Sequence, residues 1–341
     1  MPLAFSARSA LAVALLLAGP AVAADAEDCA SNTPAVSIPA CTRIIERAGE
    51  PNDKIAEAFA SRGKAHVLSN QYDRAIADLD EALRLKPTHG DARHNRGVVY
   101  FQTGQNDKAL ADFDEGVRLY PREAETRFMR GRTYHAMGQI DRAIADFDAT
   151  LSIDPGHVDA LISRGGVLVS QGKFQQAQMD LDEAIRIDPG NSEAYSNRGG
   201  LYLMTSRFPQ AIADLDRAIK LDPENGMALL NRGMSYFFQK QYDRAISDFD
   251  KALQLNPQSA HLHVQRGAAY FFKKQPDQAL SDFSEAISLD PNSLQAYKFR
   301  GGVLGGLGRR DEAIADFRKA LELDPSDESV KKNLKDLGVT P

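Results

Sequence analysis

Ser192–Asn225 reads SEAYSNRGGLYLMTSRFPQAIADLDRAIKLDPEN, and near copies of this stretch fill most of the 341-residue chain. The stretch holds two amphipathic helical patterns, a short break between them and a closing Asp-Pro. This 34-residue unit occurs eight times without insertion or deletion. A fixed period of this length indicates an array of stacked repeats rather than one globular core. The period is marked by prolines at Pro87, Pro121, Pro155, Pro189, Pro223, Pro257, Pro291 and Pro325.

Small residues recur at fixed places in the unit, whose positions are numbered 1 to 34 with Ala56–His89 as the first copy. Position 8 is Gly and position 20 is Ala in all eight copies, and position 27 is Ala except at Gly116 and Thr150. A Gly inside a helix costs about 1 kcal/mol relative to Ala, so eight of them indicate a steric requirement. We expect these positions to let the two helices of a unit approach closely.

The pattern resembles the tetratricopeptide repeat family, whose repeats carry Leu-Gly at positions 7 and 8, Tyr at 11, Ala at 20, Phe at 24, Ala at 27 and Pro at 32. Position 4 is the loosest match, with Arg93, Arg127 and His263 among its occupants. The resemblance covers residues 56–327 and implies an all-α fold: a right-handed α-solenoid of eight helix-turn-helix repeats with a concave groove. Residues 328–341 then predict a C-terminal capping helix and tail. Position 11 is Tyr in five copies: Tyr100, Tyr134, Tyr202, Tyr236 and Tyr270.

One departure from the family is systematic, because position 7 is Arg and position 23 is Asp in every copy. Arg198 and Asp214 are the pair in the fifth repeat. We expect a ladder of partly buried ion pairs between helices. The spacing leaves open whether each Asp comes from the same repeat or from the adjacent one, and eight ligand-binding charges are the alternative interpretation.

The first 23 residues have the pattern of a secretory signal peptide. Arg8 is their only charged side chain, an apolar run spans Ala10–Ala18, and Ala21-Val22-Ala23 offers the small-x-small sequence that signal peptidase accepts. The apolar run is shorter than the ~20 residues that span a bilayer, so an uncleaved anchor is the less favoured alternative. We expect an exported protein, in the periplasm of a bacterium.

Residues 24–55 hold the two cysteines of the chain, Cys29 and Cys41. An even cysteine count in an exported chain predicts a disulfide bond. A metal site is less favoured because no His lies near, and redox catalysis because the spacing is not Cys-x-x-Cys. The segment reads as an irregular helical pair that covers the open apolar face of the first repeat.

In the resembled family, positions 2, 5, 6, 9, 12 and 13 line the concave groove. Position 6 is Asn in three copies, Asn95, Asn197 and Asn231. A carboxamide both donates and accepts hydrogen bonds, so it suits binding to a peptide backbone, although solvated polar residues are the alternative. The clamp that some relatives use for a terminal carboxylate needs Lys at position 5 and Asn at position 9. The first repeat has Ala60 and Lys64 at these two positions, so we do not expect recognition of a terminal carboxylate by such a clamp.

The groove positions of repeats five to seven are unusually apolar, which is typical of a partner site. The alternative is that the Phe pairs pack against the next repeat. The residues at these positions are Leu203, Met204, Leu230, Met234, Phe237, Phe238, Val264, Phe271 and Phe272.

Several chemistries are not supported. The net charge of -6 and the absence of a basic run argue against nucleic-acid binding. The glycines of Gly301–Arg310 fall on repeat positions, lack Gly-Lys-Ser/Thr and follow no strand, so they do not form a phosphate loop. His261 and His263 point in different directions on a helix. We therefore expect no catalytic residues, no metal and no cofactor.

The sequence thus predicts a non-catalytic protein-binding scaffold that holds an extended peptide or a helix in its groove. The alternative function is a cell-envelope accessory factor that contacts polysaccharide or a secretion or assembly machine. Glycan binding is the weaker of these because the chain has no Trp to form an aromatic platform. No span is expected to remain in the membrane after signal cleavage.

Overall fold

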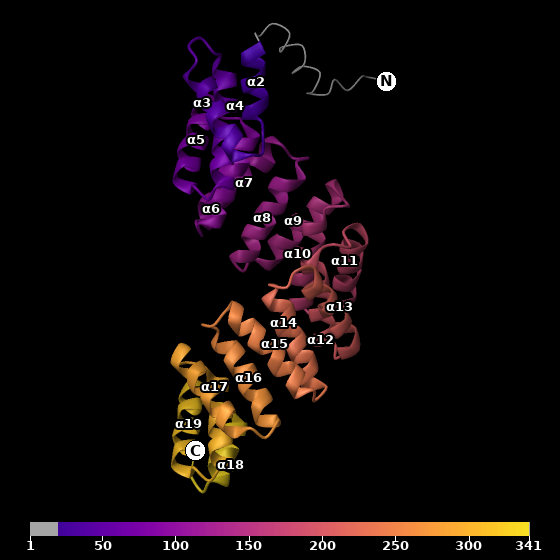
Figure 1. Ribbon diagram of the computed structural model, residues 1–341, viewed down its shortest axis with the longest axis vertical. Helices are drawn as coiled ribbons and strands as arrows, with labels where there is room; N and C mark the ends of the chain where they lie inside the picture. Colours follow the sequence, from indigo (N-terminus) through magenta and orange to yellow (C-terminus); the bar gives the residue numbers. More distant parts are fainter. Residues whose placement is uncertain (1–19, 341) are drawn as a thin grey trace. The chain divides into compact units, whose positions relative to one another are not determined.

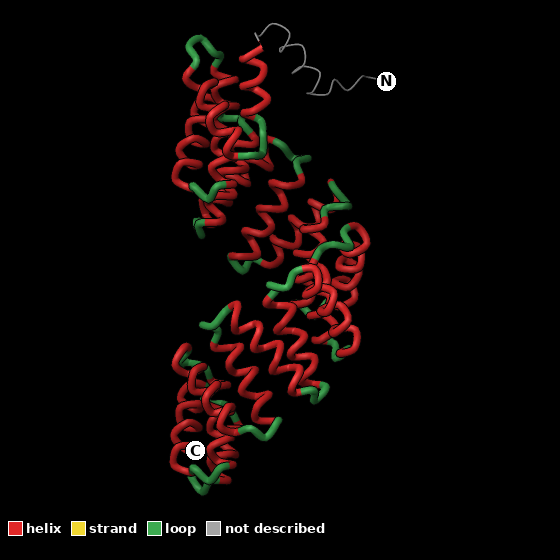
Figure 2. Tube along the Cα trace, viewed as in Figure 1, coloured by secondary structure: helices red, strands yellow, loops and turns green. Residues whose placement is uncertain are grey.

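The computed structural model describes residues 20–340. These residues form nineteen α-helices and no strand, and Figure 2 shows helices joined by short loops. Of the expected signal peptide, residues 1–19 lie outside the described part, and Pro20–Ala23 belong to helix α2. None of the helices in residues 20–340 has the length and apolar character needed to cross a membrane.

The described residues divide into two compact units, residues 20–160 (unit 1) and 161–340 (unit 2), and the division falls within α10 (Val158–Ser170). The helices follow in chain order (Figure 1). Unit 1 contains α2 (Pro20–Cys29), α3 (Pro34–Glu46), α4 (Asn52–Leu68), α5 (Tyr72–Leu85), α6 (Gly90–Gln102), α7 (Asn106–Leu119), α8 (Ala124–Ala136) and α9 (Ile140–Ile153). Unit 2 contains α11 (Phe174–Ile187), α12 (Ser192–Met204), α13 (Phe208–Leu221), α14 (Gly226–Phe238), α15 (Tyr242–Leu255), α16 (Ala260–Phe272), α17 (Pro276–Leu289), α18 (Leu294–Gly306), α19 (Arg310–Leu323) and α20 (Glu328–Asp336).

Within each unit, consecutive helices pack in pairs and the pairs stack. In unit 1, α4 packs against α5 and also against α6 of the next repeat. In unit 2, α12 packs against α13 and against α14. One apolar cluster of unit 2 joins Leu181, Leu201, Leu215 and Ala228, which come from three successive repeats. The predicted all-α fold of stacked helix pairs is confirmed.

The glycines at position 8 make room for the side chain at position 24 of the same repeat. A Cβ added to Gly199 would lie 2.5 Å from Cγ of Leu215, and one added to Gly233 would lie 2.6 Å from a ring carbon of Phe249. Both large side chains are fully buried. The sequence expectation of close helix approach therefore has a definite steric cause, because the position-24 side chain fills the space that a Cβ would take.

The glycine among the two exceptions at position 27 also has a steric cause. Gly116 on α7 faces Thr126 on α8, and an added Cβ would lie 2.9 Å from the Thr126 methyl group. In the repeat before, the corresponding residues are Ala82 and Ala92, both fully buried. The larger residue at one helix is thus matched by a smaller one at its neighbour.

Position 15 has a left-handed backbone in every repeat, and it ends the first helix of each pair. Glycine occupies it four times, as at Gly104 with φ of 74°. The other four occupants have the same backbone without being glycine: Asn70, Ser206, Lys240 and Lys274.

A row of polar residues at position 34 caps the first helix of the next repeat, a role that our sequence analysis missed. The Asn191 side chain accepts a hydrogen bond from the backbone N–H of Ala194 at 3.0 Å. Asn225 and Ser259 do the same one and two repeats later. These bonds satisfy backbone donors that a helix start leaves free.

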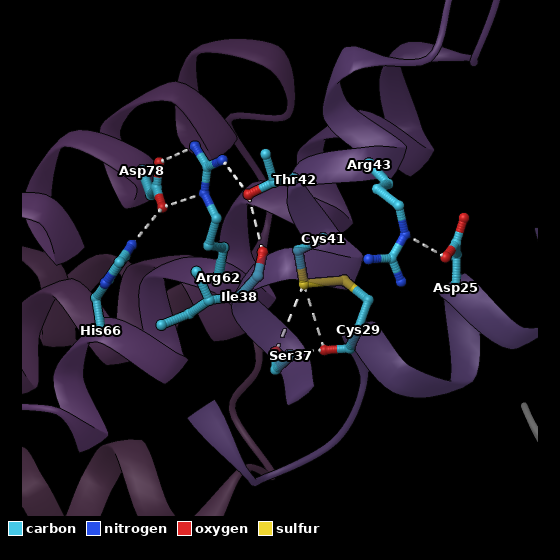
Figure 3. Close-up of a disulfide and its surroundings, with 10 residues drawn as sticks. All are labelled: Asp25, Cys29, Ser37, Ile38, Cys41, Thr42, Arg43, Arg62, His66 and Asp78. Carbon is cyan, nitrogen blue, oxygen red and sulfur yellow. Dashed lines mark hydrogen bonds and ion pairs between the residues drawn. A yellow bond between two sulfur atoms is a disulfide. The ribbon is translucent and has the colours of Figure 1, made fainter. Parts of the chain in front are cut away.

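The segment before the first repeat forms helices α2 and α3, joined by the predicted Cys29–Cys41 disulfide (Figure 3). Both cysteines are buried, together with Ala40 and Ile44 of α3 and Ala58 of α4. Asp25 of α2 accepts a hydrogen bond from Nε of Arg43 at 2.7 Å and is also paired with Arg47. The segment thus covers the apolar side of α4.

The other end of the array is covered by α20. Its apolar residues Val330 and Leu334 are buried against Leu304, Ile314 and Phe317 of the eighth repeat. Asp327 caps this helix by accepting from the backbone N–H groups of Ser329 and Val330. This agrees with a capping helix after the last repeat.

Candidate functional site

Each Arg at position 7 pairs with the Asp of its own repeat, which resolves the alternative left open by the spacing. Nε of Arg198 donates to Oδ2 of Asp214 at 2.7 Å, and its Nη2 donates to Oδ1 at 2.8 Å. This two-pronged bond raises the pKa of Arg198. The position-23 carboxylates are buried in all eight repeats: Asp78, Asp112, Asp146, Asp180, Asp214, Asp248, Asp282 and Asp316.

The same Arg also reaches back to the preceding repeat, which sequence analysis did not foresee. Nη1 of Arg198 donates to Asp182, which stands at position 25 of the repeat before, at 2.7 Å. Arg96, Arg130, Arg232 and Arg266 make the equivalent bond to Asp80, Asp114, Asp216 and Asp250. Each of these five arginines therefore joins two neighbouring repeats as well as the two helices of one.

At the start of the array, α3 takes the place of the missing preceding repeat. Nη1 of Arg62 donates to Oγ1 of Thr42 at 2.9 Å, while its other nitrogens hold Asp78 (Figure 3). In the eighth repeat, Arg300 donates to Oγ of Ser284 in the same way. These bonds give the Arg–Asp pairs a structural role.

The polar residues at position 4 belong to the same network. Arg93 lies 3.6 Å from Asp112 and donates to the backbone oxygen of Pro87. His263 occupies the equivalent place, with Nδ1 3.1 Å from Asp282 and Nε2 3.3 Å from the oxygen of Pro257. The loosest match to the family is thus explained by contacts within the fold.

The three predicted asparagines are half-buried on the first helices of their repeats. Within the described residues, the carboxamides of Asn95, Asn197 and Asn231 form no hydrogen bond with the protein. Gly200 stands beside Asn231, and a Cβ there would lie 3.3 Å from the Asn231 amide nitrogen. This glycine leaves the carboxamide uncovered, so it has free donor and acceptor capacity.

The predicted apolar residues divide by position in the repeat. Those at position 13 are the most exposed: Met204 is 59% exposed, Phe238 52% and Phe272 49%. Leu203, Leu230 and Met234 are half-buried and pack against the core of unit 2. Val264 is only 3% exposed, so the expectation that it lines a groove is wrong for this residue. Its side chain instead packs in the core with Phe283.

Six rings of unit 2 form an aromatic cluster. The cluster consists of Phe208, Phe237, Phe238, Tyr242, Phe271 and Phe272. The rings of Phe208 and Phe238 are stacked with their centroids 5.5 Å apart. Phe237 meets Phe272 of the next repeat edge to face at 5.4 Å. The Phe pairs therefore do pack between repeats, as the alternative interpretation held, and they also expose ring surface.

Residues 20–340 include no group of three or more His, Cys, Asp or Glu side chains arranged to hold a metal ion. His261 is exposed, and the neighbouring His263 is held by Asp282 and Pro257 as described above. Gly301 lies against the Phe317 ring, and Gly308 has a φ of 76°. The glycine-rich stretch therefore has the same packing and turn roles as in the other repeats.

Within each unit, stacked helix pairs linked by arginines define a helical-repeat scaffold. Profiles of the tetratricopeptide repeat family match residues 61–124, 128–192, 192–225, 227–259, 260–293 and 294–327. The matches cover most of the sequence, and the chain belongs to the tetratricopeptide repeat family. A comparison with curated proteins gives no match.

Solved structures of the same fold are similar at low sequence identity. A chain of the APC/C hetero-tetramer Cut9-Hcn1 superposes with a TM-score of 0.66 and 19% identity, over 88% of this chain and 58% of that chain. PilW, a type IV pilus biogenesis factor, superposes with a TM-score of 0.58 and 19% identity, over 62% of this chain and 98% of the PilW chain. The pilF protein of Pseudomonas aeruginosa superposes with a TM-score of 0.56 and 20% identity, over 62% of this chain and 97% of the pilF chain. At these identities the likeness concerns the fold.

Proposed function

We propose that unit 2 captures an extended peptide or a helix of a partner protein along the first helices of repeats five to seven. Tetratricopeptide repeats serve in general as scaffolds for protein–protein interaction. The observation that carries the proposal is the combination of free carboxamides at Asn197 and Asn231 with exposed apolar side chains at Met204, Phe238 and Phe272.

Both kinds of group lie on one side of the helix that bears them. Positions 6 and 13 are seven residues apart, which is close to two helical turns, so Asn231 and Phe238 project from the same face of α14. The carboxamides bond the backbone of the partner segment, and the apolar side chains contribute the burial that gives most of the affinity. This division of roles fits a segment that runs across successive repeats.

The test is photo-crosslinking from position 238 in the native host, followed by measurement of the captured segment as a synthetic peptide. We expect Asn231→Ala and Phe238→Ala each to weaken binding about tenfold, the usual effect of losing a central contact. Met179→Ala is the matched control, because Met179 is 72% exposed on α11, a second helix of its repeat. Equal affinities for all four proteins would rule out this groove.

A glycan is the second candidate partner, favoured by the two stacked ring pairs Phe208–Phe238 and Tyr242–Phe272. Flat aromatic surfaces are what sugar rings pack against. A role beside an envelope assembly machine belongs to the same alternative, and the fold is shared with PilW. Binding of purified envelope polysaccharide that is lost in Phe238→Ala and Phe272→Ala, with no peptide captured, would favour this function.

We further propose that the protein is exported to the periplasm and has no catalytic activity. The signal-like pattern of residues 1–23 and the paired cysteines support export. Thiol labelling of protein taken from its host tests it, and fully reduced Cys29 and Cys41 would count against an oxidising compartment.

A further inference from the structure

A second candidate site is a hollow in unit 1, lined by none of the residues of the proposed groove of unit 2. It is a cleft of about 690 Å³, within the size range of ligand pockets. Its walls come from the first turns of α6 and α8, from α4, and from residues 29–32, the loop that follows the disulfide-bonded Cys29. Lys64 holds this loop in place, since its Nζ donates to Oδ1 of Asn32 at 2.9 Å. We call it the N-terminal cleft.

Carboxylates outnumber cations in the N-terminal cleft. The acidic residues are Glu57, Asp91, Glu123 and Glu125, against Lys64 and Lys86. Glu123 caps α8, whereas Asp91 is exposed and, within the described residues, accepts no hydrogen bond and forms no ion pair. The cleft therefore contains at least one carboxylate that is paired with no other group of the described residues.

The acidic character persists at neutral pH. The imidazole of His89 lowers the pKa of Glu57, and that of His157 lowers the pKa of Glu125, so both carboxylates stay ionised. Burial lowers the pKa of His94, which keeps this cleft residue neutral. His89 is 94% buried, and its Nε2 completes no hydrogen bond although Glu57 lies 3.2 Å away. The polar groups of the cleft are thus incompletely paired.

Two further groups suit a cationic segment of a protein. The Tyr120 ring is 43% exposed in the cleft, held by a hydrogen bond from its hydroxyl to the backbone oxygen of Thr88. An aromatic face attracts an ammonium or guanidinium group. The free carboxamide of Asn95 lines the same cleft and can bond a peptide backbone.

We propose that the N-terminal cleft binds a lysine or arginine side chain within a basic peptide segment. The cation lies against the Tyr120 ring and beside Asp91, and Asn95 bonds the adjoining backbone. An anionic ligand is disfavoured because four carboxylates face two lysines, one of which is engaged by Asn32. The site shares no residue with the groove of unit 2, so it adds a second, chemically different contact for a partner.

The test is fluorescence anisotropy of a labelled hexa-arginine peptide in 0.15 M salt, with hexa-glutamate as the negative probe. We expect wild type to bind hexa-arginine and Asp91→Asn to bind it about threefold more weakly, a usual loss for one exposed ion pair. Asp107→Asn is the matched control. Asp107 is also exposed and is also the second residue of its helix, α7, so the change in charge and in helix-start chemistry is the same.

Equal weakening by Asp91→Asn and Asp107→Asn would mean diffuse attraction to an acidic chain and would overturn the proposal, as would absence of hexa-arginine binding. Tyr120→Leu, which removes the ring face without changing charge, should also weaken binding. Phe238→Ala should leave hexa-arginine binding unchanged. A negative result for hexa-arginine binding at the N-terminal cleft can therefore be told apart from a negative result for peptide binding in the groove of unit 2.

Discussion

Asp214 and Asp182 bond the same guanidinium group but differ in burial, with side chains 11% and 45% exposed. Replacing the buried one by Asn leaves the Arg198 charge poorly compensated between helices, so we expect Asp214→Asn to lower the free energy of unfolding by about 3 kcal/mol. Asp182→Asn should lower it by less than about 1 kcal/mol, as for surface pairs. Urea denaturation of both variants measures the difference. Equal losses would show that burial does not decide the strength of these bonds.

Lys240 has a left-handed backbone, with φ of 61°, at a position where four other repeats have glycine. This conformation costs a non-glycine residue about 1 kcal/mol or more. We expect Lys240→Gly to raise the melting temperature, because glycine adopts it without strain. Gly104→Ala should lower it for the converse reason. Thermal unfolding followed by circular dichroism provides the measurement, and a lower melting temperature for Lys240→Gly would contradict the steric argument.

His157 couples the stability of unit 1 to pH. Its Nε2 lies 3.1 Å from Glu125, which raises the pKa of His157 above 6.5 and lowers that of Glu125 below 4.5. Because the pKa of His157 is raised on folding, its stabilising effect is complete below pH 6.5 and is lost as the pH rises through the pKa of the folded state. Because the pKa of Glu125 is lowered on folding, its stabilising effect is present above pH 4.5 and is lost as the pH falls through the pKa of the folded state. The pair should therefore stabilise most between about pH 4.5 and 6.5.

The matched variant is His157→Asn, because Asn caps the corresponding helix in two other repeats. The melting temperature of wild type should exceed that of the variant most near pH 5.5, and the gap should narrow by pH 8. A pH-independent gap would mean that the capping bond to Ala160, rather than the charge, is what His157 contributes.

At the scale of helices, the close contact of α7 with α8 depends on which partner is small. Gly116→Ala should destabilise the protein, because the new Cβ would meet the Thr126 methyl group at 2.9 Å. Thr126→Ser removes that methyl and keeps the hydroxyl that bonds Nδ1 of His94 at 3.0 Å. The double variant should regain the lost stability and gain up to about 1 kcal/mol from the better helix former. Urea unfolding of wild type, the two single variants and the double variant measures the free energies of unfolding that test this coupling.

The periodic sequence predicted the helices, their pairing and the Arg–Asp bonds, because identical spacing in every copy limits each residue to one environment. It could not predict the second carboxylate at Asp182. The Asp at position 25 looks like an ordinary exposed charge, and only the packing of one repeat on another brings it to Arg198. The helix caps at position 34 were missed for a different reason, since His, Glu, Asn, Ser and Asp share the role without sharing a pattern.

The candidate sites were less predictable than the fold. The position rule of the family places Val264 and Phe238 on the same face, yet one is 3% and the other 52% exposed. Neighbouring side chains decide that difference, and a single sequence does not reveal them. The N-terminal cleft was beyond reach because the loop at Asn32 covers α4 from outside the repeat pattern.

At the scale of the molecule, the disulfide is the covalent tie of the segment that covers the first repeat. Closing a loop between residues 12 apart gives about 3 kcal/mol in the chain-entropy model. We expect a reducing agent to lower the melting temperature of wild type and to leave a Cys29→Ser, Cys41→Ser double variant unchanged. Hydrogen exchange should then speed up first in α2 and α3. Unchanged exchange after reduction would show that Asp25 and its arginines suffice.

The bond from an arginine such as Arg232 to the preceding repeat has a consequence for how long such a chain can be. If residues 192–225 were excised in frame, Arg232 would meet Asp182 where it now meets Asp216, and the bond would be the same. Duplication or loss of a whole repeat within unit 2 therefore leaves the same kind of bond at the new junction, so the number of repeats there can change. The first repeat lacks that freedom, because Arg62 takes its partner from Thr42, a residue found once.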